Sequence, residues 1–160
     1  VTTTNGEGSG IIAPNTGIMM NNMLGEEDLN PHGFFSWPSG VRLPSMMAPT
    51  LVLKDNNPLM VLGSAGSNRI RSAITQSILN YTVFGHSIEE VCSERRMHFE
   101  KGGLFFEPGF DKHVIEKAKE HYGVTVFDEK SVFFGGVNAV THDLHGGSDP
   151  RRGGVTICVE

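Results

Sequence analysis

Residues 58–70 join a short apolar segment to a helical pattern through a glycine-rich loop, and this junction constrains the fold more than any other feature. The segment PLMVL leads into Gly63-Ser64-Ala65-Gly66-Ser67. Beyond the loop, apolar residues recur every three or four positions over residues 68–84, the spacing of a helix that packs on a sheet. They are Ile70, Ile74, Ile78, Leu79 and Val83. The chain must therefore build a layer of helix on strand around this loop.

The loop admits more than one interpretation. A strand that turns into a helix places backbone N–H groups and the positive end of the helix dipole at one point, where an anion or a developing oxyanion is stabilised. The loop lacks the lysine of a phosphate loop, and Ser64 directly follows Gly63, so the spacing is not G-x-S-x-G. The sequence alone leaves open an oxyanion hole, an ordinary tight turn and a phosphate site.

The remaining pattern predicts an α+β fold, with a sheet covered by helices on one face. Two apolar runs flank Asp55-Asn56-Asn57, residues that favour turns, and they predict a β-hairpin over residues 49–66. Ser87 and Glu90 have the spacing of a capping box, and Asp111 can cap a further helix. The other expected elements are helices at 68–84, 87–92 and 111–122, and strands at 1–5, 17–22, 104–107, 124–127, 136–142 and 155–159.

Composition and charge exclude several classes of protein. With 160 residues, of which 38% are hydrophobic and 19% charged, the chain suits a single domain over residues 1–160. The net charge is −5 and basic pairs such as Arg151/Arg152 are few, so nucleic acid is not an expected partner. The longest apolar runs are about a third of a membrane span, so we expect no membrane-spanning helix. The chain starts without Met and without a signal-peptide pattern, so we expect it to be part of a longer protein.

The cysteines and histidines do not form a recognisable metal site. Cys92 and Cys158 are isolated, which excludes a cysteine-based zinc site and leaves one disulfide or two buried thiols. Of these two alternatives we expect the buried thiols. His142 and His145 lie near Asp149, but on a strand that runs into a loop the two rings would point in different directions. We therefore predict no metal ion.

Two polar segments are candidates for binding. Thr4 and Asn5 lie near the end of VTTTN, which is either an ordinary edge strand or a strand whose last polar groups point into a cleft. Glu26 and Glu27, with Asp28, form an acidic cluster that suits a substrate amine, although such clusters also occur on solvated surfaces. The cluster belongs to the polar, Pro- and Gly-rich stretch 24–48, and a loop of that length is usually functional or mobile.

Taken together, the ordered motifs resemble the small subunit of γ-glutamyltransferases (γ-glutamyltranspeptidases). The match covers residues 1 to about 155 and rests on VTTTNGEGSG, GIMMNNMLGEEDLNP, LPSMMAPTLVL, LGSAGSNRI, VNAV and SDPRRGG, in that order. The resemblance implies an N-terminal nucleophile hydrolase fold, an αββα sandwich, of which this chain is the C-terminal, small-subunit part. It also implies a self-cleaving proenzyme, a large-subunit partner, no cofactor, and a periplasmic or secreted location.

In that family, the new N-terminal threonine of the small subunit attacks a γ-glutamyl amide such as glutathione. The γ-glutamyl group then passes to water, an amino acid or a peptide. The family's nucleophile motif is Thr-Thr-His, and this chain has no such motif at its start. We therefore expect the nucleophile upstream of Val1 and do not assign it to Thr2, Thr3 or Thr4.

The resemblance also implies roles for residues near the amino group of the substrate. Thr4 resembles the threonine that hydrogen-bonds the nucleophile, and Asn5 resembles the asparagine that helps to hold the α-amino group. Either Glu26 or Glu27 would replace the family's second aspartate as the acidic anchor for that group. Met23 stands where the family usually has a polar residue.

The resemblance also implies residues that bind the α-carboxylate of the substrate and residues that stabilise the oxyanion formed in the reaction. Ser45 resembles the first of two serines that bind the α-carboxylate, and Met46 takes the place of the second. Gly66-Ser67 replaces a Gly-Gly pair whose N–H groups form the oxyanion hole, and Ser67 keeps its N–H. The departures at Met23, Met46 and Ser67 indicate a divergent branch. The alternatives to γ-glutamyl transfer are a related amide acylase and a catalytically silent binding relative.

Overall fold

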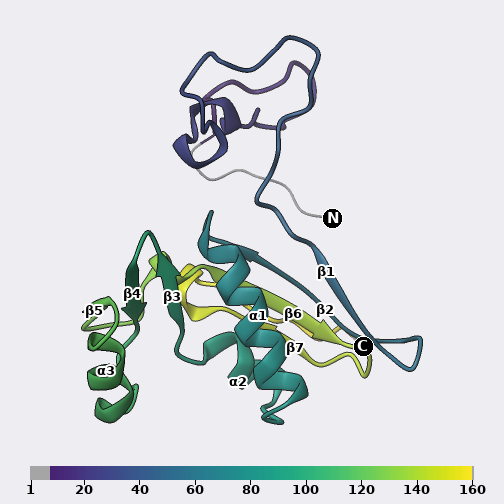
Figure 1. The fold of residues 1–160 in the computed structure, drawn as a ribbon. Coiled ribbons are helices and arrows are strands. Elements are labelled where there is room, and N and C mark those ends of the chain that lie inside the picture. The colour runs from purple at the N-terminus through teal and green to yellow at the C-terminus, as the bar shows by residue number, and fades with distance from the viewer. Residues whose placement is uncertain (1–7, 160) are drawn as a thin grey trace. The chain divides into compact units, whose positions relative to one another are not determined.

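The computed structural model describes residues 8–159, and the chain divides into two compact units, residues 1–47 and 48–160 (Figure 1). In the second unit, four strands form an antiparallel sheet in the order β1-β2-β6-β7. β1 (Thr50–Lys54) and β2 (Asn57–Ala65) form the predicted hairpin. β6 (Gly136–Thr141) pairs with the other side of β2, and β7 (Gly146–Ser148) forms the far edge.

The hairpin turn follows from its two central residues. Asp55 and Asn56 both adopt left-handed backbone angles, with φ of 50° and 64°. Positive φ at both central positions is the mark of a type I′ turn, whose twist matches that of paired strands. Asp and Asn tolerate this conformation better than other residues with a Cβ. The local sequence was therefore enough to predict the hairpin correctly.

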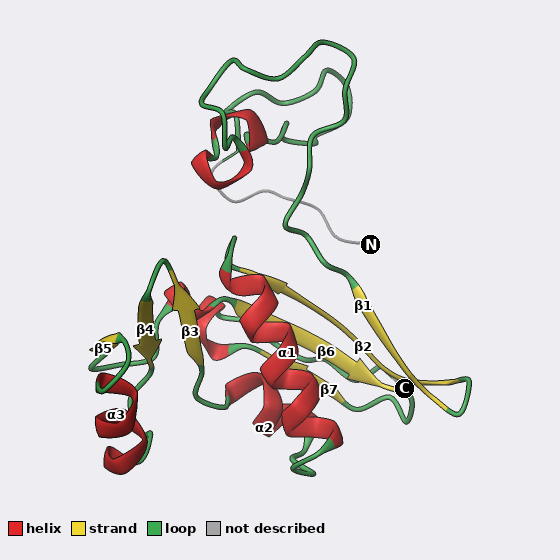
Figure 2. Ribbon diagram, viewed as in Figure 1, coloured by secondary structure: helices red, strands yellow, loops and turns green. Residues whose placement is uncertain are grey.

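Two helices cover one face of this sheet (Figure 2). α1 (Arg69–Thr82) follows β2 closely, and α2 (Ile88–Ser93) begins with the predicted capping box between Ser87 and Glu90. Alternate strand residues face the helices, because side chains of a strand alternate between its faces. No helix within residues 8–159 combines the length and the apolar character needed to cross a membrane. The core between the layers consists of Met60, Leu62, Val137 and Ala139 from the sheet with Ile70, Ala73, Ile74, Ile88 and Val91 from the helices.

The opposite face of the sheet carries an apolar row. Leu51 pairs with Val61, and Val61 pairs with Val140, so the three side chains lie side by side on one face. Their exposed fractions are 54%, 53% and 49%. An apolar row of this kind indicates a surface that another layer covers. The unit has one helix layer on one sheet layer, which confirms the α+β class and matches half of an αββα sandwich.

A smaller sheet, in the order β3-β4-β5, also belongs to the second unit. β3 (Met97–Glu100) and β4 (Gly103–Phe106) are antiparallel, whereas β4 and β5 (Gly123–Val126) are parallel. A parallel pair requires a crossover, which contains α3 (Lys112–Lys119). Asp111 caps this helix by accepting a hydrogen bond from the His113 amide at 2.7 Å. The sequence predicted β4, β5 and α3, but β3 was not among the predicted strands.

Two predicted strands are not formed. Residues 17–22 contribute only a single bridge, between Met19 and Ile12. Residues 155–159 alternate apolar and polar side chains, as a strand does, but they form no ladder with any described residue. Without such a ladder, Val155 and Ile157 remain largely exposed. The predicted strand at residues 1–5 lies outside the described residues.

β7 was not predicted, because Gly146-Gly147-Ser148 has no apolar side chain. Glycine lets this strand approach α2, since a Cβ on Gly147 would collide with the Ile88 carbonyl oxygen and lie 2.8 Å from Cys92 Sγ. Cys92 is buried, and burial raises the pKa of its thiol to about 11. Cys158 is a free cysteine too, but it is exposed. The expectation of two buried thiols is therefore right for Cys92 and wrong for Cys158, whose segment stays on the surface.

A buried ion cluster ties the C-terminal segment to the strands. Asp149 accepts hydrogen bonds from Arg96 Nη1 at 2.7 Å and from Arg151 Nη1 at 3.0 Å. Glu107 accepts one from Arg151 Nε at 2.6 Å. All four side chains are buried, and Asp149 also accepts from the Val137 amide of β6 at 2.8 Å. Each charge in this cluster faces an opposite charge, which is the condition for burying it.

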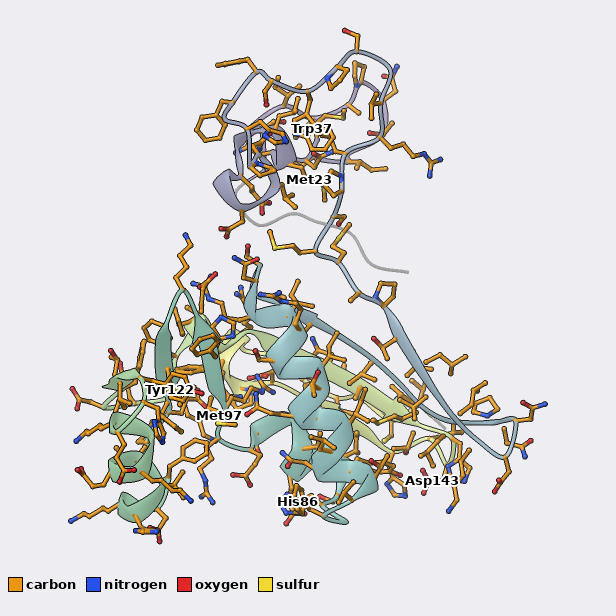
Figure 3. All side chains as sticks on the ribbon, in the orientation of Figure 1. Met23, Trp37, His86, Met97, Tyr122 and Asp143 are labelled. Atoms are coloured by element: carbon orange, nitrogen blue, oxygen red, sulfur yellow. The ribbon has the colours of Figure 1, made fainter. Side chains whose placement is uncertain are left out.

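The histidines considered as metal ligands lie away from this cluster. Asp143 lies on the turn between β6 and β7 (Figure 3). The exposed His142 and His145 are 4.0 Å and 3.8 Å from its carboxylate. Asp149 is instead bound to Arg96. Within residues 8–159, no three His, Cys, Asp or Glu side chains are arranged to hold a metal ion.

Candidate active site

The turn at Gly66 and Ser67 has two successive residues with positive φ. β2 ends at Ala65 and α1 begins at Arg69, and between them φ is +121° at Gly66 and +53° at Ser67. The Gly66 carbonyl accepts a hydrogen bond from the Arg69 amide and the Ser67 carbonyl accepts one from the Ile70 amide, both at 3.0 Å. With these carbonyls directed into the helix, the turn lies at the N-terminal end of α1, which carries the positive end of the helix dipole. Such a turn is suited to binding an anion.

The residues of the first turn of α1 supply neither a side-chain cap nor a negative charge to balance the helix dipole. Asn68 is the N-cap residue, yet its side chain makes no capping hydrogen bond, and the first turn contains no acidic residue. α2 is the opposite case, because Ser87 and Glu90 close its first turn with reciprocal hydrogen bonds of 3.2 Å and 2.8 Å. The dipole of α1 can therefore act on a negative charge placed at the turn.

Glycine is required at position 66 by a backbone contact as well as by its φ. A Cβ on Gly66 would lie 2.7 Å from the Cα of Gly135, and a Cβ on Gly135 would lie 2.7 Å from the Ala65 carbonyl oxygen. The Ser64 hydroxyl donates to the same carbonyl at 2.8 Å and accepts from the Gly136 amide at 3.3 Å. The start of β6 thus holds the turn in place. Gly135 was not among the residues predicted from the sequence, although Gly135-Gly136 is a glycine pair in it.

Polar side chains link the first two turns of α1 to β3. Asn68 Nδ2 donates to Glu100 Oε1 at 2.6 Å, and Ser72 Oγ lies 2.7 Å from His98 Nδ1. His98 Nε2 and Glu100 Oε2 are 3.6 Å apart, which is too far for a hydrogen bond. Burial lowers the pKa of His98, so its ring is neutral at pH 7. No function was predicted from the sequence for these four residues, because the paired residues lie far apart along the chain.

In the first unit, the acidic segment is organised around a buried asparagine, Asn30. Two short 3-10 turns, Met23–Gly25 and Glu27–Leu29, follow each other there. The Asn30 side chain donates to the carbonyls of Met23 and Leu24 at 3.2 Å and to that of Glu26 at 2.6 Å. Glu26 itself is partly buried. The backbone at the predicted acidic anchor is therefore held by a buried side chain.

The predicted carboxylate-binding residues lie in an extended segment of the same unit. Ser45 is exposed, and its hydroxyl accepts a hydrogen bond from the Met47 amide at 3.1 Å. Met46 is partly buried. Thr4 and Asn5 lie outside the described residues.

The predicted site residues thus form separate groups, which belong to different units of the chain. Gly66 and Ser67 share one turn of the second unit, and Glu26 and Glu27 adjoin in the acidic segment of the first. The assembly of these groups into one active site stays a prediction.

Comparison with solved structures places this architecture among the N-terminal nucleophile hydrolases. A gamma-glutamyltranspeptidase from Pseudomonas nitroreducens, complexed with L-DON, is 25% identical and has a TM-score of 0.73, covering 96% of this chain and 88% of that one. The transpeptidase enzyme CapD of Bacillus anthracis is 29% identical, with a TM-score of 0.72 and coverage of 99% and 90%. The profile of the Gamma-glutamyltranspeptidase family matches residues 1–159. The chain therefore belongs to the gamma-glutamyltranspeptidase family.

Curated relatives agree with this assignment. The Glutathione hydrolase proenzyme of Bacillus subtilis (strain 168) is 28% identical over 154 residues, which are 94% of this chain and 26% of that protein. The Capsule biosynthesis protein CapD proenzyme of Bacillus anthracis is 33% identical over 144 residues, or 86% and 26%. The chain therefore spans about a quarter (26%) of the length of each of these curated relatives.

Proposed function

We propose that this chain forms the small-subunit part of an enzyme that transfers or hydrolyses γ-glutamyl groups. The observation that carries the proposal is the Gly66–Ser67 turn, which has two successive residues of positive φ before α1 and lies where the family resemblance puts the oxyanion hole. Membership of the gamma-glutamyltranspeptidase family supplies the reaction class. The partner is the large subunit of the same proenzyme, no cofactor is required, and the location is periplasmic or secreted.

The reaction proceeds through an acyl-enzyme on a threonine upstream of Val1. Its hydroxyl oxygen attacks the γ-carbonyl carbon of the donor while its own α-amino group takes the proton, directly or through water. The oxyanion that forms is stabilised by the Gly66 and Ser67 N–H groups, and loss of one such donor typically lowers the rate by about 10² to 10³. The amine leaves, and water or an amino group then attacks the ester. Thr4 positions the nucleophile in this scheme.

The remaining predicted residues hold the amino-acid head of the donor. Glu26 or Glu27 pairs with the α-amino group, assisted by Asn5, and the Ser45 hydroxyl binds the α-carboxylate. Met46 cannot replace a hydroxyl, because its side chain has no strong hydrogen-bonding group. The missing hydrogen bond to a charged group is worth about 1.5–3 kcal/mol. We therefore propose that the head-group pocket binds weakly for this family.

Restoring that hydroxyl tests the pocket. Met46→Ser is expected to lower the KM for γ-glutamyl-p-nitroanilide about ten-fold or more, because each step of about 1.4 kcal/mol corresponds to a factor of ten. Met47→Ser is the matched control, since Met47 is an adjacent, partly buried methionine, and it should leave KM unchanged. Steady-state kinetics of the two processed variants make the comparison. Equal KM values for Met46→Ser and the wild type would show that Met46 does not face the donor carboxylate.

A second candidate function is hydrolysis of a different amide. It is favoured by Met23 and Met46, which remove polar groups from the head-group pocket, and by the similarity to the Acylase ACY 1 proenzyme of Pseudomonas sp. (strain SE83), 29% identical over 141 residues. A panel of γ-glutamyl and simple acyl anilides, given to the intact processed protein, separates the two. Turnover of γ-glutamyl anilides supports the first proposal, and turnover of acyl anilides alone supports the second. A single unprocessed band on a denaturing gel, with no turnover, would indicate a silent relative.

A further inference from the structure

We propose that Glu100 is a positioning residue for the oxyanion hole, acting through Asn68 on the Gly66–Ser67 turn. The inference rests on the proposed function of that turn. Nothing in the family resemblance assigned a role to β3, which carries Glu100. The contacts of β3 with α1 lead to this role.

The first observation is the diversion of an N-cap side chain. Asparagine at an N-cap usually accepts a hydrogen bond from the N–H two or three residues later. Asn68 instead donates to Glu100 Oε1 at 2.6 Å, across 32 residues of sequence. A hydrogen bond to a carboxylate is charge-assisted and stronger than a neutral one. The residue that immediately follows the turn is therefore held from outside the helix.

The second observation is that Glu100 is ionised and supported. Burial alone would raise the pKa of its carboxyl, but the hydrogen bond from Asn68 and the charge of Arg69 lower it below the ordinary value. His98 lies 3.6 Å from the other carboxylate oxygen and is itself only 2% exposed. One oxygen of the carboxylate is therefore bonded to the helix residue Asn68, and the other lies beside a buried residue of its own strand.

The third observation is that β3 contacts one face of α1 through two pairs of side chains. Asn68 and Ser72 are four residues apart, so their side chains lie on the same side of the helix. Asn68 contacts Glu100, and Ser72 contacts His98 at 2.7 Å. Two contacts one turn apart fix both the position and the rotation of the first turn of α1. Rotation of that turn would redirect the N–H groups of Gly66 and Ser67.

The chemical consequence follows from the geometry that an oxyanion hole requires. Its donors must lie about 2.7–3.1 Å from the oxyanion, and a displacement of about 1 Å can cost about 10²-fold in rate. The oxyanion exists only in the reaction and not in the bound donor. A positioning role for Glu100 therefore predicts a change in kcat without a change in KM.

The test uses the full-length, processed enzyme and γ-glutamyl-p-nitroanilide. Glu100→Ala and Asn68→Ala should each lower kcat about ten-fold or more, with KM within about two-fold of wild type. Glu100→Gln keeps an oxygen that accepts from Asn68, so its kcat should stay within about three-fold and its folding should be preserved. The double variant should be no slower than either single variant, because both break one link. Glu116→Ala is the control, since Glu116 is an exposed residue of α3 paired only with Lys119 among the described contacts.

Two results would overturn the proposal. They are an unchanged kcat in Glu100→Ala, and additive losses in the double variant. If the wild-type enzyme turns over no γ-glutamyl anilide, the proposed function fails, and a crystal structure of the Glu100→Ala variant then decides the positioning claim. Displacement of Gly66 and Ser67 from their positive φ values supports that claim, and an unmoved turn refutes it.

Discussion

Gly66→Ala is expected to lower kcat for γ-glutamyl-p-nitroanilide by about 100-fold or more. A residue with a Cβ rarely adopts the φ of +121° found at Gly66, and the added carbon would lie 2.7 Å from the Cα of Gly135. The turn must therefore rebuild, and its N–H groups lose their direction. Initial rates of the processed variant measure the effect. Gly66→Pro is a less informative change, because proline fixes φ near −65° in addition to removing the N–H.

Two substitutions serve as controls for this prediction. Gly85→Ala also places a Cβ at a positive φ, but no atom lies within 4 Å of it, so kcat should be close to wild type. Ser67→Gly restores a Gly-Gly pair at a residue with φ of +53°, keeps the N–H, and should retain activity. Wild-type kcat in Gly66→Ala, or equal losses in Gly66→Ala and Gly85→Ala, would remove the turn from the mechanism.

Asp149→Asn is expected to destabilise the fold by about 3–5 kcal/mol, the cost of breaking a buried ion pair from one side. The amide keeps the shape of the side chain, but Arg96 and Arg151 then face each other without the charge that separates them. Urea denaturation of the processed protein measures the change. Glu116→Gln removes one charge of an exposed ion pair and should shift stability by less than about 0.5 kcal/mol. A loss for Asp149→Asn no larger than that would show that the cluster is not a main source of stability.

The same substitution has a defined pH dependence. Burial alone would raise the pKa of Asp149, but Arg96 and the amides of Val137 and Arg151 hold it below its ordinary value. A carboxyl with a lowered folded-state pKa stabilises the fold above its unfolded pKa, about 3.9, and this stabilisation is lost as the pH falls through the folded value. The stability difference between wild type and Asp149→Asn should therefore be full at pH 7 and shrink below about pH 4. A constant difference from pH 7 to pH 3 would contradict the assignment of Asp149 as an ionised partner.

Local signals were sufficient for part of the fold. The Asp55-Asn56 turn, the Ser87–Glu90 capping box and the Asp111 cap each depend on residues within a few positions of one another, and all three were predicted. β7 was not predicted, and residues 155–159 were wrongly predicted as a strand, because both depend on residues far away in the sequence. Gly147 makes a strand possible by close contact with α2, whereas the tail has the pattern of a strand without a partner among the described residues.

The residues of the candidate site also differ in whether the local sequence was enough to predict them. Gly66 and Ser67 could be found because a strand, a glycine loop and a helix follow each other directly, and the family resemblance gave the turn a role. Gly135 and Glu100 could not be found from the sequence, because their contacts form only in the folded chain. Gly135 contacts the turn, and Glu100 contacts Asn68. Asp149 was considered as a metal ligand because sequence spacing showed its histidine neighbours and not the buried Arg96 that binds it.

The most direct test of the central claim is the turnover of γ-glutamyl-p-nitroanilide by the intact gene product, read together with its bands on a denaturing gel. We predict two subunits, release of p-nitroaniline from γ-glutamyl-p-nitroanilide by the processed protein, and no release from simple acyl anilides. A single band with no release from any anilide would contradict it.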